Sequence, residues 1–96
     1  MQLKIHKSGT SFIVAVCDKD LLGKKLKQGN TTVDISEEFY RGEIVSEEQI
    51  IEVLTNATTA NLFGERAVEC AIKCGFVDPE CVIIINGVPH AQIFCL

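Results

Sequence analysis

The 96-residue sequence lacks the features that define several specialised classes of protein. No apolar run approaches the roughly 18 residues that suggest a membrane span. The first nine residues alternate polar and apolar side chains, so they have no continuous apolar core of the kind found in a secretory signal. There is no phosphate-binding loop, no dinucleotide-binding glycine signature and no paired-histidine metal motif. These absences predict no membrane partner and point to no cofactor.

Hydrophobic residues make up 47% of the chain and charged residues 23%, the composition of an ordinary globular protein. A chain of this length buries roughly two thirds of its unfolded surface in one core, so we expect a single domain over residues 1–96. Five cysteines exclude a complete set of disulfide pairs, and four of them lie in or beside apolar segments. We therefore expect free thiols and a cytoplasmic protein.

The net charge of -4 is unevenly distributed along the chain. Residues 1–30 carry six lysines and two aspartates, whereas residues 31–96 carry three basic and eleven acidic residues. The candidates for contacts with the phosphates of a nucleic acid are Lys19, Lys24, Lys25 and Lys27. The alternative is a solvated lysine surface, since no aromatic residues alternate with these lysines as in typical single-strand binders.

Hydrophobic alternation predicts two hairpins in the first part of the chain. Residues 2–7 and 11–17 indicate two strands, and the second has apolar side chains on both faces, which predicts a central position. Lys24 to Lys27 and Thr32 to Ile35 indicate a second hairpin with its turn at Gly29. The following segment is predicted to be a loop, and its candidate ligand-contacting residues are Tyr40 and Arg41.

Two helices are predicted in the middle of the chain. Ser46 and Gln49 have the spacing of a capping box, so the first helix runs from Ser46 to about Asn56. Apolar residues then recur at three- and four-residue steps between Thr58 and Gly75, which predicts a second, longer helix.

The last part of the chain contains two predicted strands. Residues 81–85 form an apolar run without alternation, which is typical of a strand buried on both faces, and residues 91–96 form the last strand. The sequence thus predicts an α+β fold, with two helices packed on a mostly antiparallel sheet in the order β-β-β-β-α-α-β-β.

The loop at 86–92 is the first candidate site. Pro89 fixes the backbone just before His90, and histidine suits proton transfer or ligand contact near neutral pH. We therefore take His90, Asn86 and Gln92 as candidate ligand- or partner-binding residues. The alternative is a surface histidine that closes a hairpin, because Asn86 and the glycine after it are a strong turn signal without any function.

The second candidate site lies inside the predicted long helix. Glycine within a helix costs about 1 kcal/mol relative to alanine, so Gly64 suggests a close approach of backbone or ligand, with Asn61 one turn away. The alternative is close packing of the helix on a strand.

Three cysteines lie close enough in the sequence to be candidate metal ligands. Cys70 and Cys74 share a helix face and lie close in sequence to Cys81, but their spacing differs from that of structural zinc sites and a fourth ligand is missing. We predict no metal site.

Several segments resemble a known family over essentially the whole chain. The longest are Asn-Ala-Thr-x-Ala-Asn-Leu-x-Gly-Glu-Arg-Ala-Val-Glu at 56–69 and Gly-Val-Pro-His-Ala-Gln at 87–92. With these motifs the sequence resembles the small archaeal proteins grouped as domain of unknown function 424. The resemblance implies a single-domain cytoplasmic archaeal protein and implies no reaction. Its motifs contain Asn61, Gly64 and His90, either as a shared site or as a folding signature.

Three functional hypotheses follow. The leading one is a non-enzymatic binding module for RNA or for a ribonucleoprotein or translation-related partner, with lysines providing attraction and His90, Arg41 and Asn61 local contacts. The second is a small enzyme in which His90 acts as acid or base in a pocket with Asn61 and Tyr40. The third is a protein-interaction or homodimerising subunit that pairs through the apolar strand at 93–96.

Overall fold

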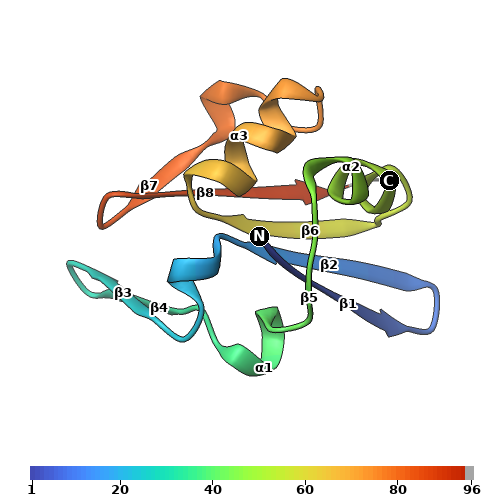
Figure 1. The fold of residues 1–96 in the computed structure, drawn as a ribbon. Coiled ribbons are helices and arrows are strands. Elements are labelled where there is room, and N and C mark those ends of the chain that lie inside the picture. The colour runs from blue at the N-terminus through green and yellow to red at the C-terminus, as the bar shows by residue number, and fades with distance from the viewer. Residues whose placement is uncertain (95–96) are drawn as a thin grey trace.

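The computed structural model describes residues 1–94 and consists of a six-stranded sheet, a separate two-stranded hairpin and three helices (Figure 1). The strands are β1 (Gln2–Ser8), β2 (Ser11–Cys17), β3 (Lys25–Gln28), β4 (Thr31–Asp34), β5 (Glu43–Ile44), β6 (Thr59–Phe63), β7 (Ile83–Ile85) and β8 (Val88–Phe94). The helices are α1 (Glu37–Tyr40), α2 (Glu47–Thr55) and α3 (Glu65–Lys73), and two 3-10 turns lie at Lys19–Leu21 and Pro79–Cys81. None of the helices described is long and apolar enough to cross a membrane.

The main sheet has the strand order β5-β1-β2-β6-β8-β7, and β3 pairs only with β4. Neighbouring strands are antiparallel except β2 and β6, which run parallel with Ile13 beside Thr59 and Cys17 beside Phe63. The predicted α+β fold with a mostly antiparallel sheet is therefore confirmed. The parallel pair places the carboxyl ends of β2 and β6 next to each other, where α3 begins.

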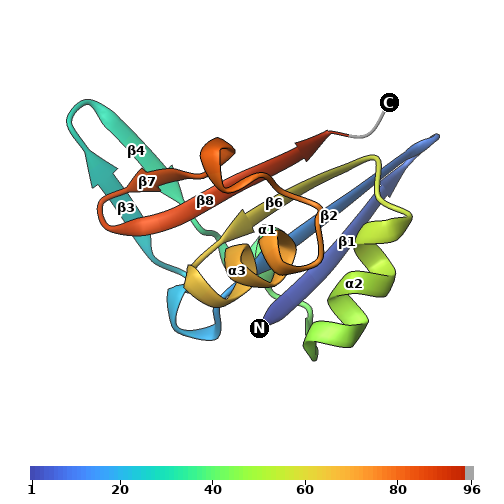
Figure 2. The ribbon, with the colours of Figure 1, turned by 90° about the horizontal axis from the view of Figure 1, so that it is seen from above.

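The sheet has two covered faces, which we name by what covers them. The helix face packs under α2 and α3, and its buried strand residues are Leu3, Val14, Val16, Ala60, Leu62, Ala91 and Ile93. The hairpin face is covered in part by α1 and the β3–β4 hairpin, which pack on Ala15, Cys17, Phe63 and Ile85. Figure 1 shows these two layers on opposite sides of the strands, and in Figure 2 the hairpin reaches β7.

Several local predictions are confirmed. The first hairpin is β1–β2, the second is β3–β4 with its turn at Gly29, and β2 is central and buried on both faces. At the start of α2, the Ser46 hydroxyl accepts a hydrogen bond from the Gln49 amide and the Gln49 side chain accepts one from the Ser46 amide. This capping box satisfies two amides at the end of the helix.

The predicted helix from Thr58 to Gly75 is wrong in its first half. Residues 59–63 form β6, and only Glu65–Lys73 are helical. In β6 the side chains alternate between the two faces, so Leu62 lies on the helix face while Phe63 lies on the hairpin face. Five residues fit both a strand and a helical stripe, which is why the helical spacing was misleading.

Three boundaries in the rest of the chain also differ from the prediction. The predicted strand at 81–85 is not buried on both faces, because Ile83 and Ile84 are each 54% exposed in the short edge strand β7. The last strand begins at Val88, so His90 lies within β8 and not in a loop. The predicted loop after β4 contains the short helix α1. Cys95 and Leu96, predicted to end the last strand, lie outside the described residues.

Candidate functional site

The candidate site residues of β6 and β8 come together on the hairpin face of the sheet. Asn61 pairs with Gln92 and Phe63 pairs with His90 in the antiparallel ladder. The side-chain amide of Gln92 donates a hydrogen bond of 3.1 Å to the side-chain oxygen Oδ1 of Asn61. Asn61 is half-buried and Gln92 is exposed, so this amide pair presents polar groups on the uncovered half of the face.

His90 is held as a structural side chain within this ladder. Its ring stacks on Phe63 at a centroid distance of 4.0 Å, and it is only 8% exposed. Nδ1 lies 2.9 Å from the Leu62 carbonyl oxygen, which only accepts, so Nδ1 carries a proton. Burial lowers the pKa of His90 below its ordinary value, although the hydrogen bond to Leu62 opposes that shift. The neutral imidazole is therefore the favoured form.

A row of five rings crosses the hairpin face from β1 to β8, and its members are His6, Phe39, Tyr40, Phe63 and His90. Successive centroids are 4.3, 5.1, 5.8 and 4.0 Å apart. Tyr40, in the middle, is 5% exposed, and burial raises the pKa of its phenol. Tyr40 thus lies beneath the surface, between α1 and the sheet, and contributes to packing.

Gly64 does not lie inside a helix, contrary to the sequence interpretation. It joins β6 to α3 with a φ of +109°, a conformation that glycine adopts at low cost. Its amide donates to the Pro89 carbonyl oxygen at 2.8 Å. The turn from strand to helix requires a glycine at this position. Gly64 lies near Asn61 because Asn61 is in β6 and Gly64 directly follows that strand.

The first turn of α3 is capped by a carboxylate from the neighbouring strand. Asp18, directly after β2, accepts hydrogen bonds from the amides of Arg66 at 3.1 Å and Ala67 at 2.9 Å. Asp18 is 8% exposed and lines a cavity of about 320 Å³ together with Asp20 and Glu65. Helix N-termini attract anions, but here the protein supplies its own anion, and the three carboxylates of the lining outnumber its one cation, Arg66, so the cavity disfavours a phosphate.

All four candidate lysines are exposed. Lys25 and Lys27 lie opposite Asp34 and Thr32 in the β3–β4 ladder, and alternate with Leu26, whose side chain is buried. The two lysines therefore project from the outer side of the hairpin. Among the described residues, the ion pair within 4 Å joins Arg41 and Glu37, so none of these lysines takes part in one.

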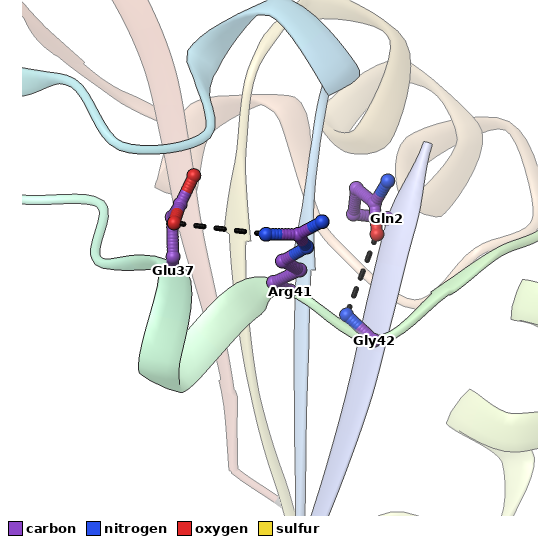
Figure 3. Close-up of polar contacts among 4 residues, drawn as sticks. All are labelled: Gln2, Glu37, Arg41 and Gly42. Carbon is purple, nitrogen blue, oxygen red and sulfur yellow. Dashed lines mark hydrogen bonds and ion pairs between the residues drawn. The ribbon is translucent and has the colours of Figure 1, made fainter.

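Arg41 and Asn86 have local structural partners. Arg41 lies at the end of α1, with its guanidinium 3.8 Å from the Glu37 carboxylate (Figure 3). The next amide, of Gly42, donates to the Gln2 side chain at 3.3 Å (Figure 3). Asn86 has a φ of +47° in the β7–β8 turn, and its backbone amide donates a hydrogen bond of 2.6 Å to the side-chain oxygen of Gln28.

Two residues with clear roles were missed from the sequence. Asp18 is not among the candidates drawn from the sequence, although an acidic residue at the end of a buried strand is well placed to cap a neighbouring helix. Gln28 is not among those candidates either, and no local signal in the sequence indicates that it reaches Asn86. No group of three or more potential metal-ligating side chains is found among residues 1–94.

These features define a small α+β domain built on a mixed six-stranded sheet, with helices on one face and a hairpin over part of the other. The chain belongs to the family described as "Protein of unknown function (DUF424)", whose model matches residues 6–96. A solved structure described as an uncharacterized conserved protein from Methanopyrus kandleri is similar, with a TM-score of 0.82 and 32% sequence identity. The similarity covers 96% of this chain and 88% of that one. No curated protein matches the chain.

Proposed function

We propose that this chain is a non-enzymatic RNA-binding module. The lysines of the β3–β4 hairpin, together with Lys19, attract the phosphates, and the amide pair of Asn61 and Gln92 on the uncovered half of the hairpin face contacts bases. Partners are RNA itself or a ribonucleoprotein. Phosphate contacts supply most of the affinity in this class of interaction, and polar contacts to bases add selectivity.

The observation that carries the proposal is the group of exposed lysines on and next to the β3–β4 hairpin. Lys24, Lys25 and Lys27 project from the hairpin without an ion-pair partner in the described part of the chain. Against these lysines, the strands β3 and β4 carry one acidic residue, Asp34. Other exposed acids lie at Asp20 and on α1, and on the two helices of the opposite face, at Glu47, Glu48, Glu52, Glu65 and Glu69. A protein with a net charge of -4 thus presents a locally basic hairpin, which a polyanion approaches with less repulsion.

The geometry of His90 supports a binding role over an enzymatic one. A general acid or base must reach the substrate within hydrogen-bond distance. His90 is 8% exposed with Nδ1 bound to the backbone, and Tyr40 is buried beneath α1. The side chains assigned to the enzyme hypothesis therefore do not line one accessible pocket. We place the module in the cytoplasm, a proposal supported by four free cysteines in the described residues, at 17, 70, 74 and 81.

The test is a titration of a labelled single-stranded RNA of mixed sequence, followed by fluorescence anisotropy at several salt concentrations. For single strands the slope of log affinity against log salt is about 0.7 per phosphate neutralised, so Lys24→Ala and Lys25→Ala should each reduce it by about that amount. Lys73→Ala, on α3, is the matched control and should leave the slope unchanged. Salt-independent binding, or equal effects of all three variants, would contradict the proposal.

A further inference from the structure

The outer edge of β8 is only partly covered by β7. β7 pairs with residues 88–90, whereas β8 continues to Phe94. Within the described residues, no strand pairs with the outer edge of 91–94. This leaves a notch beyond the end of β7 in which one further strand would continue the sheet.

The backbone groups that face this notch follow from the ladder. The Gly64 amide donates to the Pro89 carbonyl, so Pro89 turns its carbonyl toward β6. Because hydrogen-bonding direction alternates along an antiparallel strand, Ala91 and Ile93 also face β6. Gln92 and Phe94 then direct their amide and carbonyl groups outward, away from the sheet.

The side chains around the notch are uncharged apart from any proton on His90. A cavity of about 230 Å³ is lined by Cys81, Ile83, His90, Ala91, Gln92 and Phe94. Ile83 is 54% exposed and Phe94 is 69% exposed. Edge strands are normally protected by charge, proline, a bulge or a covering element. At the other side of the sheet, β5 pairs with residues 2–3 of β1, and the rest of that edge strand carries Lys4 and Lys7, whereas residues 91–94 carry no charged side chain.

We propose that this edge binds the same edge of a second copy of the chain, antiparallel, with the twofold axis at Ile93. In that register Gln92 lies opposite Phe94 of the second copy, and the outward groups of the two residues form four hydrogen bonds. The edge is self-complementary because Gln92 and Phe94 each offer a backbone amide as donor and a backbone carbonyl as acceptor. The absence of fixed charge means that a second copy meets no like-charge repulsion.

This inference does not depend on RNA binding. The side chain of Phe94 would lie beside Gln92 of the second copy on the hairpin face, so the dimer removes exposed apolar surface from water. The two sheets would form one continuous sheet of twelve strands, with both β3–β4 hairpins on the same side. The lysine variants test RNA affinity and the variants at Gln92 and Phe94 test the dimer, so failure of one proposal can be distinguished from failure of the other.

The test compares Gln92→Pro with Gln92→Ala by sedimentation velocity over roughly a hundredfold concentration range, under reducing conditions because Cys74 and Cys81 are exposed. Both variants lose the side chain, but only proline loses the outward amide, and it leaves the pairing with β6 intact. Wild type and Gln92→Ala should dimerise. Gln92→Pro should raise the dimer dissociation constant by about 100-fold, since symmetry removes two hydrogen bonds at once.

A second variant and a second measurement guard against misfolding of Gln92→Pro. Phe94→Lys keeps the backbone but places two like charges across the axis, and it should also give monomers. In hydrogen exchange, the amides of Gln92 and Phe94 should become slower as concentration rises, while those of Ala91 and Ile93 are slow throughout. A wild type that stays monomeric, equal effects of proline and alanine, or a dimer that survives Phe94→Lys would overturn the proposal.

Discussion

The carboxylate of Asp18 occupies the space that a Cβ atom on Gly64 would need. The same carboxylate caps α3, and Gly64 has a φ of +109°. Three features therefore coincide at the end of β6. The strand ends, α3 begins, and Asp18, which follows the neighbouring parallel strand β2, caps that helix. This pair of residues fixes the direction in which α3 leaves the sheet.

Gly64→Ala should destabilise the protein strongly. The positive φ costs about 1–3 kcal/mol for a residue with a side chain, and displacing Asp18 costs about 1 kcal/mol more through the lost cap. Gly75→Ala is the matched control, because Gly75 also has a positive φ (+83°) but has open space around it. Urea denaturation should show a larger loss for Gly64→Ala than for Gly75→Ala.

The coupling between the two residues is open to a double-mutant cycle. Asp18→Ala alone removes the cap, and in that background Gly64→Ala meets no carboxylate and keeps only the 2.8 Å contact with the Cβ atom of residue 18. The double variant should therefore lose less stability than the sum of the single variants. Strict additivity would show that the two side-chain positions do not compete for one space.

Stability should fall in acid partly because of His90. Its pKa in the folded state lies below the ordinary value of 6.5, so the unfolded chain binds the proton more readily. This contribution is complete above about pH 6.5 and is lost as the pH falls through the lower folded pKa. Denaturation curves between pH 7 and pH 5 should show a shallower decline for His90→Gln than for wild type. His6→Gln serves as the control, and an identical decline in wild type and His90→Gln would contradict the expectation.

The described thiols should fall into two reactivity classes. Cys17 is fully buried, and burial, with the nearby charge of Asp18, raises the pKa of its thiol to about 11. Burial also raises the pKa of Cys70. Because the thiolate is the reactive form, iodoacetamide at neutral pH should label the exposed Cys74 and Cys81 first. Peptide mapping by mass spectrometry would read out each site, and early labelling of Cys17 would contradict the buried position of β2.

Gln28→Ala should loosen the β3–β4 hairpin from the sheet. The Gln28 side chain accepts a hydrogen bond from the Asn86 amide at 2.6 Å, across 58 positions of sequence. Its loss should speed hydrogen exchange at Asn86 while changing global stability by about 1 kcal/mol or less. Lys27→Ala, on the outer side of the same strand, should leave that exchange rate unchanged.

Much of the fold could be predicted from sequence because its signals are local. The β1–β2 and β3–β4 hairpins have alternating side chains and a glycine turn, and α2 has its capping box within four residues. The strand β6 has no comparable local signal. Ala60, Leu62 and Phe63 satisfy helical and extended periodicities equally, and the pairing with β2 that decides between them is set far away in sequence.

The local sequence pattern also does not determine whether an apolar run is buried. Residues 83–85 are all isoleucine, yet Ile83 and Ile84 are exposed, because β7 lies at the end of the strand order. The candidate site was predicted in part: Asn61, Gln92 and His90 do lie together on one face. Their arrangement depends on the β6–β8 register, which no motif encodes, and Tyr40 and Gly64 have structural roles.

The parallel pairing of β2 with β6 also constrains the order of folding. The backbone groups on the inner edge of β2 can form their hydrogen bonds only after β6 has been synthesised. Ile13, for example, lies beside Thr59, 46 positions later in the chain. At about 5–20 residues per second, the nascent β1–β2 hairpin leaves the ribosome several seconds before its partner strand. During that interval it exposes an apolar strand edge to other chains. We therefore expect the hairpin to be the part of the nascent chain most exposed to chaperones, and the pairing of β2 with β6 to be the slow step of folding.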